Sequence, residues 1–91
     1  MDQKHAETLA LQALAFLAKH EELLNQFVSQ SGLSLNDLKK RAHEPELLGG
    51  VLDVILEDDK TLLSFCNLTE ISPETLIKAR IALPGGMHIS V

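Results

Sequence analysis

Apolar residues recur at helical spacing along almost the whole chain, and in two segments they extend beyond the narrow stripe of an ordinary surface helix. They spread over about 220° of a helical wheel in residues 4–19 and about 200° in residues 45–56. The first set is Leu9, Leu11, Leu14, Phe16 and Leu17, and the second is Leu47, Leu48, Val51, Leu52, Val54, Ile55 and Leu56. Because burying apolar surface is favourable, each segment is predicted to be a helix at the centre of the fold or against a partner.

Start and stop signals divide the rest of the sequence into short helices. Gly32 suits the left-handed position that ends a helix, and Ser34 with Asp37 suits an N-cap and first turn. Ser72-Pro73-Glu74 is a strong start signal. We expect helices over residues 4–19 and 35–43, one ending at residue 31, one beginning at Pro45, one capped by Asp58 or Asp59, and one over 73–83. No stretch has the alternation of a strand. The predicted fold class is therefore all-α, a compact bundle of about five to six short helices.

The two halves of the sequence resemble each other. Each half contains a Phe, a Leu or Ile six residues after it, a Ser directly after that, and a Leu eleven residues after the Phe. These residues are Phe27, Leu33, Ser34 and Leu38 in the first half, and Phe65, Ile71, Ser72 and Leu76 in the second. The pattern predicts two similar three-helix halves, with the two wide-faced helices as counterparts. We expect those helices to pack together, within the chain or across a dimer.

Length and charge limit the classes of protein. The sequence has 91 residues, typical of a single domain, and we expect residues 84–91 to form a flexible tail. The net charge of −5 disfavours general nucleic-acid binding, because Lys and Arg supply most of that affinity. The apolar segment Leu9–Ala18 is too short to cross a membrane and lacks the basic residues that precede a signal sequence. The single cysteine, Cys66, suits a reducing compartment, so a cytoplasmic location is expected.

No motif predicts catalysis, a cofactor or a metal. None of His5, His20, His43 and His88 has a second His or Cys at the spacing of a helical metal site. Cys66 lies in an apolar frame typical of an inert, buried thiol. The run Glu57-Asp58-Asp59 lacks the alternating ligands and glycine turn of a calcium site, so a capping role is predicted. We therefore expect a protein that is not an enzyme.

Two groups of residues are candidates for an interaction site. The cations Lys39, Lys40 and Arg41, with Lys78 and Arg80 in the matching helix, form the one basic cluster; it either offsets helix dipoles at the surface or binds an acidic partner or nucleic acid. The second group is Gly49, Gly50 and Asp53, on the side of their helix opposite the apolar arc. The paired glycines predict close approach of another backbone, or a place where a ligand reaches the main chain.

The frame from Ala6 to Ala18 resembles the opening of a family of short alphaproteobacterial proteins of unknown function. Later parts of that family's pattern are similar to Gly32-Leu33, Leu38, Gly50-Val51-Leu52-Asp53 and Ala79-Arg80. The resemblance covers most of the chain. It implies a bacterial, cytoplasmic, helical protein and supplies no activity, ligand or catalytic residue.

The width of the apolar arcs favours a protein-interaction or self-associating module. The expected partner is a second copy, as a homodimer, or a helix of another protein. The alternative is binding of nucleic acid or an acidic partner through the small basic patch, which the acidic net charge makes the weaker prediction. No membrane association is expected.

Overall fold

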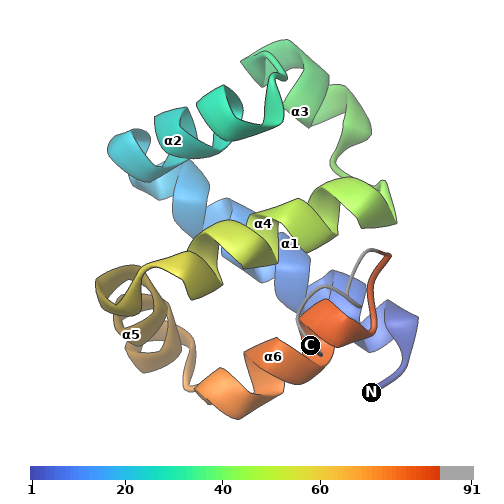
Figure 1. Ribbon diagram of the computed structural model, residues 1–91, viewed down its shortest axis with the longest axis vertical. Coiled ribbons are helices and arrows are strands. Elements are labelled where there is room, and N and C mark those ends of the chain that lie inside the picture. The colour runs from blue at the N-terminus through green and yellow to red at the C-terminus, as the bar shows by residue number, and fades with distance from the viewer. Residues whose placement is uncertain (85–91) are drawn as a thin grey trace.

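The computed structural model describes residues 1–84, and within them the chain forms six helices and no strand. The helices are α1 (Gln3–Lys19), α2 (Glu21–Ser31), α3 (Leu35–Arg41), α4 (Pro45–Glu57), α5 (Asp59–Thr69) and α6 (Pro73–Ile81). In Figure 1, α4 crosses in front of α1, with α2 and α3 on one side of it and α5 and α6 on the other. The predicted all-α bundle is confirmed.

Side chains at the helix starts satisfy backbone N–H groups that have no partner within the helix. The Oδ1 atom of Asp2 accepts a hydrogen bond from the His5 N–H at 2.8 Å. Ser34 and Asp37 form a reciprocal capping box at the start of α3. Ser72 caps α6, and Asp58 is the residue that caps α5. These local signals explain why the helix starts follow the sequence prediction closely.

The ends of α2 and α5 lie in the left-handed region of backbone conformation. Gly32 has a φ of 74° and ends α2, as predicted. The matching residue of the second half is Glu70, with a φ of 60°. A residue with a Cβ atom is strained in this region and glycine is not, so the same turn is more costly in the second half.

The two wide-faced helices, α1 and α4, pack against each other within the chain, and α6 packs against both. Their contact forms the centre of one core, to which Phe27 of α2 and Phe65 of α5 add aromatic rings. The α4 arc is buried almost completely. The α1 arc is covered less fully than predicted, because Leu11 is 46% exposed and Leu14 is half-buried. The outer side of α1 therefore keeps apolar surface in contact with water.

The predicted likeness of the halves holds for both packing and capping. Phe27 and Phe65 are both buried, as are Leu38 and Leu76. Ser34 and Ser72 both cap the helix that follows them. The second half thus repeats the helix order of the first around a shared core.

The flexible tail predicted for residues 84–91 lies, from residue 85 onward, outside the described residues. Within them, Leu83 is buried, and the carbonyl oxygen of Pro84 accepts a hydrogen bond from Arg80 Nη1 at 3.0 Å. The chain is therefore fixed to the core up to Pro84.

Candidate interaction surface

Arg80, one of the predicted interaction residues, is a buried structural cation. It is 5% exposed. Its Nε donates to Asp53 Oδ1 at 2.6 Å and its Nη2 to Asp53 Oδ2 at 3.1 Å. This bidentate pair joins α6 to α4 in the geometry that makes Arg–carboxylate bonds strong. With the bond to Pro84, the guanidinium group is hydrogen-bonded on all three nitrogens, so Arg80 has no exposed charge to offer a partner.

The basic cluster predicted from the sequence is divided between separate parts of the molecule. Lys39, Lys40 and Arg41 are exposed on α3, whereas Lys78 is exposed on α6. These helices lie at opposite ends of the view in Figure 1. Arg41 Nη2 lies 2.8 Å from Glu44 Oε1, and this pairing raises the pKa of Arg41 and lowers the pKa of Glu44. Lys39 and Lys40 are the cations of the predicted patch that stay together without an ion-pair partner in residues 1–84.

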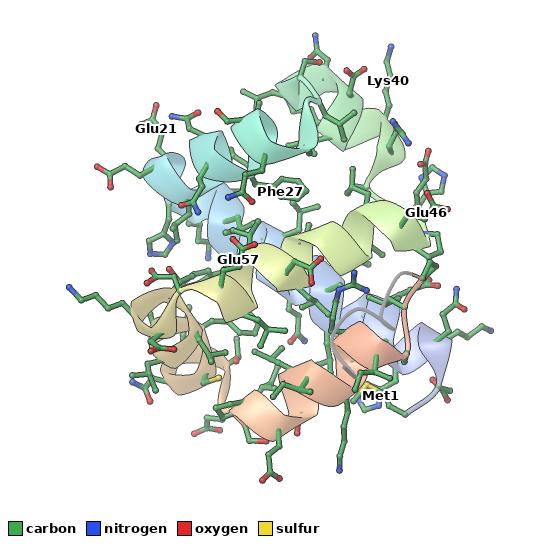
Figure 2. The ribbon with its side chains drawn as sticks, viewed as in Figure 1. Met1, Glu21, Phe27, Lys40, Glu46 and Glu57 are labelled. Atoms are coloured by element: carbon green, nitrogen blue, oxygen red, sulfur yellow. The ribbon has the colours of Figure 1, made fainter. Side chains whose placement is uncertain are left out.

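The two adjacent glycines of α4 face different neighbours. A Cβ atom at position 49 would lie 2.9 Å from Arg80 Nη1 and 3.2 Å from the Pro84 carbonyl oxygen, so Gly49 admits both groups. This is the close approach that the sequence predicted, made by a side chain as well as a backbone. A Cβ atom at position 50 would meet Phe27 at 3.5 Å, an ordinary contact. Figure 2 shows Phe27 pointing from α2 into the space between α2 and α4.

The first half of the molecule has an apolar groove, which we call the α1–α3 groove. It encloses a cavity of about 240 Å³. It is lined by Leu14, Ala18, Leu24, Leu35, Leu38, Lys39 and Ala42. Leu35 is 51% exposed at its edge, and Leu11 lies one helical turn from Leu14 on the same side of α1. Apart from the ammonium group of Lys39, every side chain that lines the groove is apolar.

The second half has a groove at the matching position, with different chemistry. It is lined by Asp53, Leu56, Glu57, Leu62 and Ile77. Residues of α4 match the residues of α1 that lie 39 positions earlier, and residues of α6 match those of α3 that lie 38 positions earlier. Asp53 therefore corresponds to Leu14, Glu57 to Ala18, and Ile77 to Lys39. Two carboxylates therefore replace two apolar side chains, and water hydrates this groove more readily than the α1–α3 groove.

The sequence did not single out the α1–α3 groove. Its signal was present in the excess width of the α1 arc, where Leu11 and Leu14 extend beyond the side that faces the core. A second signal was Leu35, which directly follows the N-cap Ser34 and so begins α3 with an apolar side chain. Neither signal shows which of these leucines remain exposed once the helices have packed together.

The groups with chemical reactivity are dispersed. Cys66, predicted to be buried, is only half-buried, and this burial raises the pKa of its thiol, which disfavours the reactive thiolate. The His20 ring stacks on Phe16 with centroids 4.3 Å apart, and its Nδ1 lies 2.8 Å from the Phe16 carbonyl oxygen. Within residues 1–84, no three His, Cys, Asp or Glu residues are placed to hold a metal ion.

The fold and its surface define a small all-helical protein made of two similar three-helix units around one core. The chain belongs to the family described as Protein of unknown function (DUF3572), whose model matches residues 3–86. The predicted resemblance to a helical family of unknown function is thereby confirmed. No curated protein and no solved structure matches the chain. In the part of the chain that the structure describes, no helix is long and apolar enough to cross a membrane.

Proposed function

We propose that this protein is a non-catalytic, self-associating helical module, and that the α1–α3 groove of one copy is covered by a second copy. The observation that carries the proposal is the groove's lining, apolar except for Lys39, next to the exposed side chains of Leu11 and Leu35. Removing apolar surface from water contributes about 25 cal/mol per Å². Burying the walls of the groove and the two exposed leucines against a second copy therefore favours association.

The face is distinct from the rest of the surface in how its apolar residues are grouped. Leu63 and Leu68 of α5 are more exposed, at 57% and 68%, but neither of them lines the α1–α3 groove or the matching groove of the second half. Single exposed leucines are common on soluble proteins, whereas a hollow with contiguous apolar walls is a recurrent feature of helix-binding sites. The α1–α3 groove is therefore a stronger reason to expect association than the exposure of single leucines.

The reason for expecting association differs from the one given by the sequence. The wide arcs of α1 and α4 cover each other within the chain, so they do not by themselves require a partner. The apolar surface that still lacks cover lies on the outer side of α1 and on α3. A helix of another protein is the alternative occupant of the groove, and nucleic acid has less support because Arg80 is buried and Arg41 is paired with Glu44.

We place the protein in the cytoplasm. The free thiol of Cys66 supports this placement, because a lone cysteine persists in a reducing compartment. Detection of the protein in the cytosolic fraction of its host cell would test it, and recovery from an oxidising compartment would contradict it.

Sedimentation velocity over a wide concentration range tests self-association. We expect a concentration-dependent dimer that Leu11→Lys or Leu35→Lys weakens by about tenfold or more, since each places a charge on the apolar face. Leu68→Lys is the matched control, because it makes the same change at an exposed leucine outside the groove. A strict monomer at millimolar concentration, or equal weakening by the control, would contradict the proposal.

A further inference from the structure

The outer side of α1 carries a linear stripe that begins at a carboxylate and ends beside a lysine. Glu7, Leu11, Leu14 and Ala18 follow one another at spacings of three or four residues, so they lie along one side of the helix. Ala18 and Leu14 line the same cavity as Lys39 of α3. The stripe therefore has an anionic residue toward its start and a cationic residue beside its end.

Neither of these charged residues has an ion-pair partner within residues 1–84. Glu7 is half-buried and accepts a hydrogen bond from Gln3 Nε2 at 3.0 Å. Lys39 lines the groove and is exposed, so its ammonium group can meet an acid of a partner. The stripe and groove thus present apolar surface between an acid, Glu7, and a base, Lys39.

We propose that the partner is a second copy of this chain, docked with its α1 antiparallel to the first around a two-fold axis between Leu11 and Leu14. In this arrangement Leu11 of each copy enters the other copy's groove. Glu7 comes to the level of Ala18 in the second copy, within reach of that copy's Lys39, and the symmetry makes the ion pair twice. The inference rests on the proposed self-association and adds its geometry.

The charge pattern favours this occupant over an unrelated helix. A two-fold interface must be complementary to itself, which requires opposite charges at equal distances on either side of the axis. Residues 7 and 18 are equally far from a point between residues 12 and 13, and Lys39 lies beside Ala18. A parallel arrangement of two α1 helices would instead bring the two Glu7 side chains together, which is unfavourable.

A charge exchange measured by sedimentation equilibrium at low salt tests this geometry. Glu7→Lys and Lys39→Glu should each weaken the dimer about fivefold, because each converts two exposed attractive pairs into repulsive ones. The double variant should restore the wild-type dissociation constant to within about twofold. Because Lys and Glu have similar helix propensities, the variants should keep the fold, which circular dichroism checks.

The matched controls are Glu21→Lys and Lys40→Glu, which make the same charge changes outside the stripe. Figure 2 shows both side chains directed away from the body of the molecule. They should leave the dissociation constant within about twofold of wild type. A dimer that ignores the Glu7 and Lys39 exchanges would overturn the antiparallel geometry while self-association stands. Assemblies larger than a dimer would also overturn it. A wild-type chain that stays monomeric would instead remove the proposed function itself.

Discussion

The two halves of the molecule repeat the same helices, but they hold their third helix in place differently. In the second half, Arg80 of α6 is buried and paired with Asp53 of α4. At the matching positions of the first half stand Ala42 and Leu14, and a cavity lies between them. α6 therefore packs firmly against α1 and α4, whereas Leu38 is the one buried residue of α3.

The glycine at position 49 belongs to the same difference. Its counterpart in α1 is Ala10, a buried residue that carries a methyl group, and the residue that matches Arg80 is the much smaller Ala42. Gly49 has no methyl group, and Arg80 occupies that space. The comparison teaches that one substitution, a long cation in place of alanine, requires an acid and a glycine on the neighbouring helix. In the first half, where Leu14 and Ala42 stand at the matching positions, the α1–α3 groove stays open.

The largest expected difference concerns the matching core leucines. Leu76→Ala should destabilise the protein by about 4 kcal/mol and Leu38→Ala by about 2 kcal/mol. The reason is that Leu38 already borders a cavity, so it loses fewer contacts. Chemical denaturation of both variants measures the two costs. Equal costs would show that α3 is packed as firmly as α6.

The ion pair is the next test. Asp53→Ala should destabilise by about 2 kcal/mol, because it leaves the buried guanidinium group without its counter-charge. The cost is below that of a fully buried pair, since the Asp53 side chain is 41% exposed and water can partly replace it. Lys78→Ala, on the same helix but exposed, should change stability by less than about 0.5 kcal/mol. A neutral Asp53→Ala would mean that the pair does not fix α6.

The two glycines of α4 should respond with opposite signs. Gly49→Ala should destabilise by about 1 kcal/mol, because the clash with Arg80 and Pro84 outweighs the gain in helix propensity. Gly50→Ala should stabilise by about 0.5–1 kcal/mol. In an Arg80→Ala background, Gly49→Ala should become favourable, as Ala10 is in the first half. Thermal melts of these variants decide the matter, and a Gly49→Ala cost that is unchanged in that background would refute the link.

The left-handed helix ends predict a smaller effect. Glu70→Gly should stabilise by about 0.5 kcal/mol, because glycine relieves the strain of a positive φ but adds entropy to the unfolded chain. Gly32→Ala should destabilise by about 1 kcal/mol at the matching position. The same melts give both values, and loss of stability in Glu70→Gly would show that the Glu70 side chain makes a contact worth more than the strain.

The smallest effect is a dependence on pH at the start of α5. Hydrogen bonds from Thr61, led by its hydroxyl at 2.6 Å, hold the pKa of Asp58 below its ordinary value of 3.8. A lowered pKa in the folded state stabilises the fold above pH 3.8, and this contribution is lost as the pH falls through the folded value. The matching cap of α2 is His20, which makes no such bond. Thr61→Val should therefore reduce the loss of stability on acidification, measured by melts between pH 6 and pH 2.5. An unchanged pH profile would count against the cap.

The sequence was most informative where structure is decided by neighbouring residues. The N-caps at Ser34 and Ser72 and the turn at Gly32 depend on bonds and angles within a few residues, and the prediction was correct at each. The repeat was also readable, because the core positions of both halves keep the same residue types. Boundaries shifted by one or two residues, as at the end of α3.

The features that the sequence did not reveal depend on distant residues. Arg80, in the last turn of its helix, has the appearance of a surface cation, and its partner Asp53 is 27 residues away. The α1–α3 groove depends on where α3 settles against α1, which helical periodicity does not determine. Chain-local patterns thus predicted the elements, while the candidate surface came from their packing.

The central position of α1 has a consequence for how the molecule comes apart. Since α1 contacts α2, α4 and α6, the internal repeat does not mark a boundary between two autonomous folding units. Cleavage of the chain before Pro45 would separate the two halves. Each fragment would then expose the apolar surface that the other half covers. Thermal melting is therefore expected to be a single cooperative transition, in which both three-helix halves unfold together.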